Sequence, residues 1–464
     1  MFAYRAFHSI TPNAIIRPTF RLCDMLMKPD IASVRRASSS AASFAPREFP
    51  STGFEVIDQA NKIEEERLPF YQSEEYYPMR IGEVVGGHYQ VSAKLGYGTT
   101  STVWLARDLR DQRFWALKVH INTLKHNQEL EVYRHLASFP GEQHSMGRQY
   151  IRQLETSFKL NGPHGEHEVF VMTPLRLSLQ SFLSIRKGQK FDKVFVKAAL
   201  NQVLVGLMSL HEVDVIHSDL HLDNLLVSVT DASVMSAIEE NEIKRPSARK
   251  LLNDRTIHVS QTILGGGGPL TICDFGQARI GKTHRGVAMP TQYRAPEIIL
   301  DMEWGNAVDL WSVGLIAWDL LEQEPLFSIY DQTYQENNDA YHLAAMTVLL
   351  GPPPPEFLKR SEKATKYWDK DGNKRHPFHQ FEGIFLAPLT VVLGQWIGPV
   401  PLPSNRTLES LAKVLTGEEK DLFIDFIRFF LWWLPEERVD ALHSYFHPWL
   451  GNKNPNSEAE ENAA

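Results

Sequence analysis

The sequence predicts a two-lobed α+β fold, in which a small antiparallel sheet with one helix precedes a larger, mostly helical lobe. Short runs of alternating apolar residues fill the first part of the chain, and long segments with the helical apolar period fill the second part. The change falls near Pro174. With 464 residues, 43% of them hydrophobic and 22% charged, the chain is long enough for a large core and has the composition of a globular protein.

The first lobe is predicted over residues 74–174. At Glu74 begins a lead-in rich in Tyr, Pro and Gly, and alternating apolar residues typical of strands follow it. One segment has the helical period instead, with Leu130, Val132 and Tyr133 on one face. The predicted strands cover 89–95, 102–108, 114–119, 154–160 and 169–172, and the predicted helix covers 128–136.

The second lobe is predicted over residues 175–450, with a disordered tail at 451–464. A polar stretch at about 230–268 contains a run of glycines, and we expect it to be an inserted spacer or loop. The most apolar run, 422–434, contains charged residues and is too short to cross a bilayer, so it indicates a buried helix. The predicted helices cover 194–211, 307–321, 342–350 and 421–433.

The N-terminal segment, residues 1–73, differs from the rest in composition. Its first 47 residues are rich in Arg, Ser and Ala and poor in acids, which fits either a mitochondrial transit peptide or a disordered basic tail. We therefore expect the protein in the cytoplasm or nucleus, or in the mitochondrion if the segment is a transit peptide. The 2 cysteines are too few for a disulfide framework or a zinc site, and a net charge of -8 gives no indication of nucleic acid.

A glycine-rich turn, LGYGTTSTVWLA, joins the first two predicted strands. Gly96 and Gly98 have no side chains, so the backbone amides there can approach a polyphosphate closely. Ser101 stands where a third glycine is usual. The turn alone therefore leaves a phosphate site and a structural hairpin as alternatives.

Lys118 lies in the middle of an apolar strand, FWALKVH. An unpaired ammonium group there is costly unless anions compensate it. Nucleotide phosphates and a carboxylate from a helix would compensate the charge of this lysine. Glu129 is a better candidate than Glu131, because only its register turns the apolar residues of that helix inward. The alternative interpretation is a lysine that ends a surface strand.

The segment VIHSDLHLDNLLV is the strongest single indication of chemistry. A phosphoryl acceptor hydroxyl needs one carboxylate to orient it and accept its proton, and Asp219 is the candidate base. Asn224, five residues further on, can bind a metal ion that neutralises the phosphates. We interpret His217 as a structural residue that fixes the loop.

The segment TICDFGQA follows the spacer. It places Asp274 on a turn that leaves a strand, where we expect the principal Mg²⁺ ligand. Phe275 is expected to pack beneath this turn, and Gly276 to allow it. The sequence thus predicts two metal ligands, Asn224 and Asp274.

Three later charged residues are expected to be structural. Glu297 ends the segment TQYRAPE, Asp309 lies at the start of a predicted buried helix, and Arg438 lies near the C-terminus. A buried Glu297 needs a cation, and the planar fork of Arg438 can bind a carboxylate with two hydrogen bonds.

Taken in order, these residues resemble the signature of eukaryotic protein kinases across nearly all of residues 89–450. The resemblance implies a bilobal protein kinase fold, with ATP and Mg²⁺ as cofactors and transfer of the γ-phosphoryl group to Ser or Thr of a protein. Within that superfamily the chain is similar to the SR-protein kinases in its glycine-rich turn, in an H-x-D loop without the usual arginine, in its spacer, and in the segment HLAAMTVLLGPPPPEFLKRS. The other residues that the resemblance assigns to ATP binding are Leu95, Val103, Ala116, Met172, Thr173 and Leu175.

Two departures from the family pattern concern turnover and substrate. His221 stands where the pattern has a lysine, two residues beyond the catalytic aspartate, which predicts a slower enzyme. The SR-protein kinases are expected to have an acidic docking groove, but this chain offers only Glu324 and Asp339 near the corresponding helix. The resemblance implies a basic or Arg/Ser-rich protein substrate, and the scarcity of acids in this chain argues against processive phosphorylation of long repeats.

Ser218 occupies the place where many regulated kinases have an arginine beside the catalytic aspartate. In those kinases the arginine binds a phosphorylated residue of the activation segment and thereby orders the segment. The neutral hydroxyl of serine offers no charge for a phosphate. We therefore expect activity without phosphorylation of the activation segment, residues 274–297. Thr283 is its only plausible phosphosite apart from Thr291, which we expect to contact the loop that carries Asp219. The alternative is that Lys282 and Arg285 supply the missing charge and the enzyme is still switched.

Two rival functions are considered. HSDLHLDN also resembles the loop of aminoglycoside and choline phosphotransferases, but residues 295–297, Asp309 and Arg438 are features of protein kinases. A pseudokinase that binds partners without catalysis is the other rival, supported by His221 and Ser101. We expect a monomer with a protein substrate and no direct nucleic-acid or membrane partner.

Overall fold

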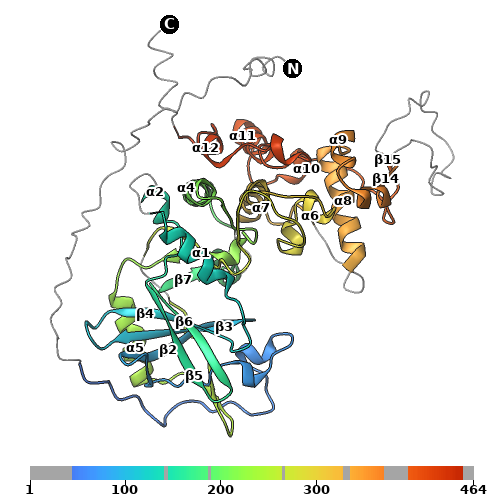
Figure 1. Cartoon of the computed structure of the whole chain (residues 1–464). Helices are drawn as coiled ribbons and strands as arrows, with labels where there is room; N and C mark the ends of the chain where they lie inside the picture. The colour runs from blue at the N-terminus through green and yellow to red at the C-terminus, as the bar shows by residue number, and fades with distance from the viewer. Residues whose placement is uncertain are drawn as a thin grey trace, which may run out of the picture. The chain divides into compact units, whose positions relative to one another are not determined.

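The computed structural model describes residues 44–139, 145–186, 190–263, 267–327, 335–369 and 395–452. Its first lobe contains a six-stranded antiparallel sheet and the predicted helix (Figure 1). The strands run in the order β1-β2-β3-β4-β6-β5. They are β1 (Val84–Val85), β2 (Tyr89–Gly98), β3 (Ser101–Asp108), β4 (Phe114–His120), β5 (Thr156–Gly162) and β6 (Gly165–Met172), and the helix is α1 (Gln128–Ala137). The predicted strands and helix are confirmed, and β1 is an additional strand.

The second lobe is mostly helical, as predicted. The four predicted helices are present as α4 (Lys193–Glu212), α7 (Ala307–Leu321), α8 (Gln335–Leu350) and α11 (Gly417–Arg428). The shorter helices are α2 (Ser145–Arg148), α3 (Leu179–Ile185), α6 (Pro296–Ile299), α9 (Pro355–Leu358), α10 (Leu408–Leu411) and α12 (Ala441–Tyr445). Short 3-10 turns η4 (Leu222–Asn224), η5 (Thr291–Tyr293), η6 (Glu362–Lys366) and η7 (Pro435–Glu437) connect these elements.

Small sheets between the lobes carry the catalytic segments. β9 pairs with β7 on one side and with β12 on the other, and β8 pairs with β13. All these pairs are antiparallel. The strands are β7 (Leu175–Ser178), β8 (Val215–Ile216), β9 (Leu225–Ser228), β12 (Leu270–Ile272) and β13 (Arg279–Ile280), with β14 (Trp368–Asp369) and β15 (Gln395–Trp396) further along.

Helix α4 is long and apolar enough to span a membrane by length and composition alone. In the structure it contacts α7, α12 and β12 within the second lobe. Its residues Leu200, Leu204 and Leu207 are completely buried. Its apolar composition is therefore that of a core helix.

The predicted helix over 421–433 is too long at its C-terminal end. Helix α11 begins at Gly417 and ends at Arg428, and the chain then turns. The carbonyl of Trp432 accepts hydrogen bonds from the Arg438 guanidinium at 3.1 and 3.2 Å. Trp433 and Leu434 are buried but are not helical. The apolar run therefore predicted correctly that these residues are buried, but it did not predict their secondary structure.

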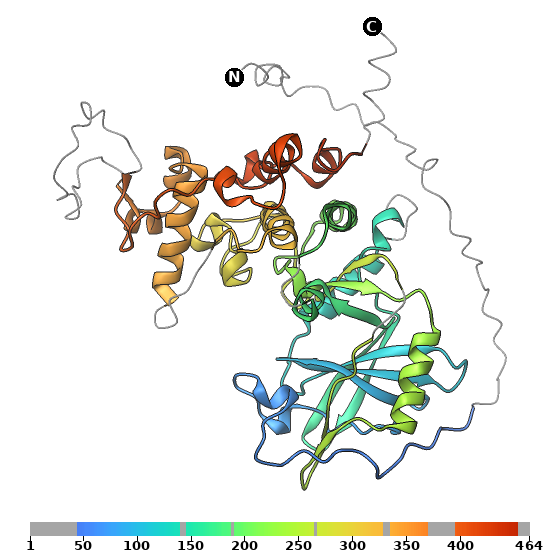
Figure 2. The ribbon, with the colours of Figure 1, turned by 180° about the vertical axis from the view of Figure 1, so that it is seen from behind.

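Of the two expectations for the stretch at about 230–268, a spacer or a loop, the loop is wrong for the residues that the structure describes. The spacer contains α5 (Ser233–Lys244) and a hairpin of β10 (Arg249–Leu251) and β11 (Thr256–His258). Residues 264–266, which include the first two glycines of its glycine run, lie outside the described residues. Helix α5 contacts β2 (Figure 2). Met235 and Ile263 of the spacer share a buried cluster with Ala93 and Leu105 of the first lobe. The apolar residues are sparse in sequence, but they gather against one face of the sheet.

Structure also begins earlier than the predicted boundary at Glu74. We call residues 44–76 the N-terminal strap. Its first backbone amide, that of Phe44, bonds the carbonyl of Leu109 at 2.7 Å, and Val56 forms a parallel bridge with Arg249 of the spacer. Strap and spacer therefore lie side by side along the first lobe (Figure 2). Of the transit peptide or basic tail predicted at 1–47, residues 1–43 lie outside the described residues, whereas Arg47 pairs with Glu239 of the spacer at 2.7 Å. Of the disordered tail predicted at 451–464, residues 453–464 lie outside the described residues.

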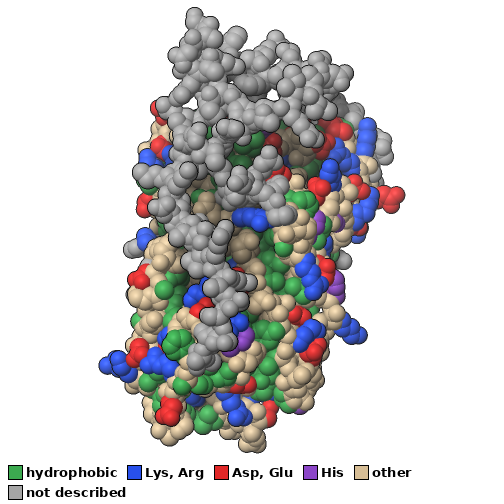
Figure 3. Space-filling model, turned by 60° about the vertical axis from the view of Figure 1, so that its left-hand side comes forward, with side chains coloured by type: hydrophobic (Ala, Val, Ile, Leu, Met, Phe, Trp, Pro, Cys, Tyr) green, Lys and Arg blue, Asp and Glu red, His purple; other side chains and the backbone are tan. Residues whose placement is uncertain are grey.

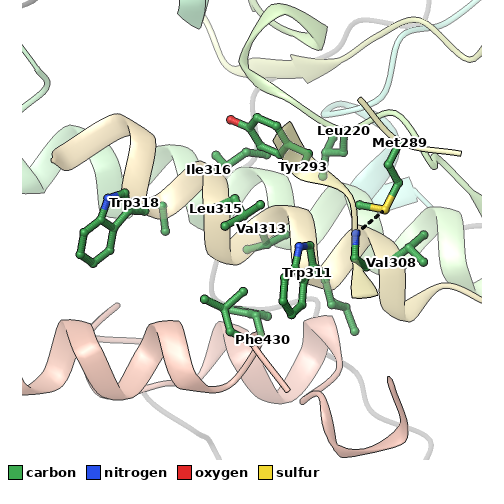
Figure 4. Close-up of a cluster of buried hydrophobic side chains, with 14 of the residues drawn as sticks. Leu220, Met289, Tyr293, Val308, Trp311, Val313, Leu315, Ile316, Trp318 and Phe430 are labelled. Carbon is green, nitrogen blue, oxygen red and sulfur yellow. Dashed lines mark hydrogen bonds between the residues drawn. The ribbon is translucent and has the colours of Figure 1, made fainter. Parts of the chain in front are cut away.

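The main hydrophobic core lies in the second lobe and extends to α1. Figure 4 shows a part of it, in which Trp311 and Val313 of α7 face Phe430 on one side. Leu220 and Met289 lie in the same cluster. The loop that carries Asp219 thus rests on this buried cluster.

Candidate active site

Strand β4 and helix α1 bring Lys118 and Glu129 together. Lys118 Nζ lies 2.6 Å from Glu129 Oε2, and the Glu129 side chain is only 4% exposed. The Asn127 side chain caps α1 by accepting a hydrogen bond from the amide of Leu130 at 3.2 Å, which fixes the start of the helix. Glu131 is on the outer face and pairs with Arg134 at 3.0 Å. The choice of Glu129 over Glu131 from the helical register is confirmed.

Both members of the pair are charged: Lys118 is protonated and Glu129 is ionised. Burial alone would raise the pKa of the Glu129 carboxyl, but the charge and hydrogen bond of Lys118, together with the nearby His120 ring, lower that pKa to about 2. Burial works against the ammonium group of Lys118, yet the carboxylates of Asp274 and Glu129 raise its pKa above the ordinary value. The site therefore keeps a buried cation next to the place where the sequence predicts phosphates.

His120 is a site residue that the sequence analysis missed. Its Nε2 lies 3.5 Å from Glu129 Oε2, and its Nδ1 lies 3.1 Å from the carbonyl oxygen of Glu168. The ring is 3% exposed and packs against Phe170 with centroids 4.4 Å apart. Strand alternation could have found it, because residues two apart on a strand share one face and His120 is two residues after Lys118.

The catalytic loop holds Asp219, His221 and Asn224 close together. Asn224 Nδ2 donates to the backbone oxygen of Asp219 at 2.8 Å and lies 3.3 Å from its Oδ2. His221 Nε2 lies 3.1 Å from Asn224 Nδ2 and 3.8 Å from Asp219 Oδ2. The Asp219 side chain is 25% exposed, so a substrate hydroxyl can reach it.

Asp309 of α7 fixes the backbone of this loop. Its carboxylate accepts the amides of His217 and Ser218 at 2.9 and 2.8 Å, and His211 Nε2 lies 2.9 Å away. Ser218 has a φ of 57°, a left-handed conformation that costs energy for a residue with a side chain. The buried carboxylate therefore stabilises a strained loop, and His217 Nε2 adds a contact of 2.9 Å to the carbonyl of Cys273.

Asp274 and Phe275 follow β12 beside this loop. Asp274 has a φ of 64°, its side chain is 51% exposed, and its Oδ1 lies 3.5 Å from Lys118 Nζ. The amide of Gly276 donates to the same oxygen at 3.3 Å. Phe275 is completely buried and packs edge-on against Tyr133 of α1, with centroids 5.6 Å apart. The turn thus points the carboxylate outward and the ring into the core.

The residues assigned to ATP binding by resemblance lie on the first lobe and the connection that follows it. Ala116 of β4 is opposite Met172 of β6 in the sheet, and Val103 of β3 is opposite Lys118. Leu95 packs against the buried cluster that the spacer shares with the sheet. Thr173 follows β6 and is exposed, and Leu175 begins β7. No bound nucleotide tests these assignments, so they stay predictions.

Gly96 and Gly98 leave room around the turn between β2 and β3. A Cβ added to Gly96 would meet nothing within 4 Å, and one added to Gly98 would meet only the Ser101 oxygen at 4.0 Å. Packing within the chain therefore does not require glycine at these two positions. The open space is what close approach of a ligand to the backbone needs.

Glu297 of α6 and Arg438 form a buried bidentate pair. Arg438 Nη1 and Nη2 each lie 2.6 Å from one oxygen of Glu297, and both side chains are at most 1% exposed. Arg438 also donates to the carbonyl of Ala307 at 2.9 Å. The pair predicted from the sequence therefore connects the end of the activation segment to α7 and the C-terminal part of the chain.

Comparison with known proteins decides which family has this arrangement. The protein kinase domain matches residues 89–450, which is most of the chain. The chain belongs to the protein kinases. A serine/threonine protein kinase of Aspergillus fumigatus is 36% identical over 411 residues, covering 87% of this chain and 95% of that protein.

More distant relatives are also protein kinases. The serine/threonine-protein kinase SRPK of Physarum polycephalum is 28% identical over 424 residues, covering 84% of this chain and 92% of that protein. The serine/threonine-protein kinase AFC1 of Arabidopsis thaliana is 26% identical over 304 residues, covering 64% of this chain and 60% of that protein. This kinase is therefore a serine/threonine protein kinase, and its likeness to SR-protein kinases is distant.

The kinase offers a donor set that fits Mg²⁺ bound together with ATP. Among the described residues no group of three or more His, Cys, Asp or Glu side chains could hold a metal by itself. Asn224 and Asp274 are brought close because the amide of Cys273 bonds the carbonyl of Asn224 at 2.8 Å. Two protein ligands suffice for Mg²⁺, which keeps waters and takes phosphate oxygens of the nucleotide.

Replacing His221 by Lys is expected to raise kcat several-fold at pH 7. A lysine ammonium group is a compact positive charge at this pH, and a cation near the transferring phosphate stabilises the negative charge of that phosphate. Steady-state rates at saturating ATP are the measurement. His443→Lys, at an exposed position of α12, controls for the added charge. An unchanged or lower kcat would show that histidine is no handicap here.

Proposed function

We propose that this kinase transfers the γ-phosphoryl group of Mg-ATP to Ser or Thr in basic or Arg/Ser-rich protein segments, and that it does so without phosphorylation of its activation segment. The observation that carries the second part is the bonding of Ser218. Its hydroxyl donates to the carbonyl of Gln277 at 2.7 Å, and its own carbonyl accepts the amide of Met289 at 2.9 Å. Ser218 thus connects the catalytic loop to the beginning of the activation segment through its neutral hydroxyl, and to Met289 further along the segment through its backbone carbonyl.

Other contacts support the activation segment along its length. β13 pairs with β8, directly before the catalytic loop. His284 and Trp304 exchange two backbone hydrogen bonds of 2.8 and 2.9 Å, and the Trp304 indole donates to the carbonyl of Gly286 at 3.1 Å. Met289 packs beside Leu220 in the buried cluster of Figure 4. These contacts need no phosphate.

The cations of the alternative interpretation lie on the surface. Arg285 is 73% exposed and lies 3.8 Å from Glu303, and Lys282 is also exposed. Exposed pairs of this kind contribute little to stability. Thr283 is exposed beside them, so a phosphate there would remain in solvent. This geometry favours an enzyme whose segment is already held.

Each chemical step has a residue for it. When bound, ATP would supply the phosphoryl group, and Mg²⁺ would supply positive charge that neutralises the phosphates. Lys118 presents a cation to phosphate oxygens, and Glu129 keeps it in place. Asp219 accepts the proton of the substrate hydroxyl, while Asn224 holds the loop through the 2.8 Å bond to the Asp219 carbonyl.

The substrate part of the proposal rests on the likeness to SR-protein kinases and on charge. The net charge of -8 favours a basic partner, although charges of both signs are interspersed over the face shown in Figure 3. Of the two candidate docking acids, Asp339 is already 3.2 Å from Lys363 and 3.8 Å from Arg294. A carboxylate neutralised in this way does not hold a long basic tract, so we propose action at single sites.

Phosphatase treatment and Thr283→Ala are each expected to leave kcat within about threefold of the untreated enzyme. The reason is that Ser218 offers no cation for a phosphate. Initial rates at saturating ATP and peptide are the measurement. A loss of about tenfold or more, which corresponds to roughly 1.4 kcal/mol in the barrier, would contradict independence from phosphorylation.

The substrate class is tested with radiolabelled ATP and matched acceptors. An Arg/Ser peptide should be labelled faster than the same peptide with Glu in place of Arg, and aminoglycosides should not be labelled. Equal labelling of both peptides would refute the preference for basic segments. The absence of any peptide labelling would refute the proposed activity itself.

A further inference from the structure

The N-terminal strap is joined to the first lobe through three consecutive acids. The 3-10 turn η1 (Glu64–Arg67) places Glu65 against Lys94 of β2, and the ammonium group of that lysine is fully buried. Glu66 binds Lys250 of the spacer at 2.7 Å. The third acid, Glu64, accepts the hydroxyl of Ser260 at 2.5 Å and lies 3.5 Å from the same β2 lysine. Strap, spacer and sheet are therefore interlocked beside the glycine-rich turn.

The last residue of the strap contacts that turn directly. Tyr76 Oη lies 3.1 Å from the carbonyl oxygen of Gly98 and 2.9 Å from that of Thr99. The ring is 5% exposed. Burial, with the nearby carboxylates of Glu65 and Glu75, raises the pKa of Tyr76 to about 12. The hydroxyl therefore stays protonated at neutral pH and donates to these carbonyls.

The contact also sets the direction of the backbone amides. In a trans peptide group the C=O and N–H bonds point in opposite directions. When the carbonyls of Gly98 and Thr99 face Tyr76, the N–H groups of Thr99 and Thr100 face away from the strap. Backbone amides at a turn of this kind are the donors that bind phosphate oxygens.

We propose that the strap holds the glycine-rich turn in its nucleotide-binding form, with Tyr76 as the positioning residue. This inference deepens the proposed function, because it assumes that the turn binds the phosphates of ATP. Lys94 lies on the same strand only two residues before Gly96, so its buried pair with Glu65 fixes the beginning of the turn. Tyr76 fixes its tip. Residues 44–76 then support the nucleotide site and are not only a lead-in.

Tyr76→Phe tests this proposal, because it keeps the ring and removes only the hydroxyl. Tyr77→Phe is the matched control. Tyr77 is the next residue, and its hydroxyl donates to Glu83 at 2.7 Å instead of to the turn. Two properties of the full chain are measured: the hydrogen exchange of the amides of residues 98–102 without nucleotide, and the Kd for Mg-ATP by calorimetry. Thermal unfolding of both variants confirms that they fold.

In Tyr76→Phe the exchange is expected to accelerate and the Kd for Mg-ATP to rise about fivefold, the equivalent of one lost hydrogen bond. The Tyr77→Phe protein should match the unmodified chain in both properties. Equal exchange in the two variants, or an unchanged Kd in Tyr76→Phe, would overturn the proposal. A chain that binds Mg-ATP but labels no peptide would refute the proposed activity, and the exchange and Kd would still decide on the strap.

Discussion

Asp274→Ala is expected to abolish phosphoryl transfer and to weaken Mg-ATP binding, whereas Asp219→Ala should leave that binding nearly unchanged and lower kcat about 10²- to 10⁴-fold. The two carboxylates are separate in the structure. The Asp274 side chain is half exposed, and its carboxylate lies 3.5 Å from the Lys118 ammonium group. This position suits a Mg²⁺ ligand that lies between the lysine and the nucleotide phosphates. Asp219 is held by the catalytic loop through Asn224.

The measurements are calorimetric Kd values for Mg-ATP and single-turnover rates for each variant. Asp223→Ala is a suitable control, since Asp223 is in the same loop and its carboxylate lies 3.1 Å from the hydroxyl of Ser178. If Asp219→Ala weakens nucleotide affinity as much as Asp274→Ala does, the assignment of base and metal ligand is wrong. If Asp274→Ala retains turnover, the metal assignment fails by itself.

Arg438→Met is expected to be the most destabilising single substitution considered. It leaves the Glu297 carboxylate buried and without its cation, and breaking a buried pair in this way typically costs about 3–5 kcal/mol. The midpoint of thermal unfolding should fall by roughly 10 °C. Differential scanning calorimetry without nucleotide is the measurement.

The comparison that isolates burial is Arg428→Met. Arg428 lies 2.6 Å from Glu409, but both side chains are more than half exposed, so the midpoint should change little. The double variant Glu297→Gln with Arg438→Met should be less destabilised than Arg438→Met alone, because the unpaired charge is gone. Similar losses for Arg438→Met and Arg428→Met would contradict this account.

Local pattern predicted the elements that carry the site, and the reason is that these elements are regular. Alternation over the strands gave β2, β3 and β4, and the helical period of α1 distinguished Glu129 from Glu131. The same reasoning extended α11 too far, because an apolar run does not separate a helix from a buried turn. The stretch at about 230–268 was predicted only as an inserted spacer or loop, and its helix and hairpin were not foreseen, because its few apolar residues show no dense pattern.

The sequence by itself determined the family, the order of the chemical residues and the identity of the Lys118–Glu129 and Glu297–Arg438 pairs. Only the tertiary structure decided that the strap and the spacer are parts of the first lobe, and that Tyr76 contacts the glycine-rich turn. The physical reason is distance along the chain. Periodicity reports how a residue relates to neighbours a few positions away, whereas Glu66 and Lys250 are 184 positions apart and meet only when the chain folds.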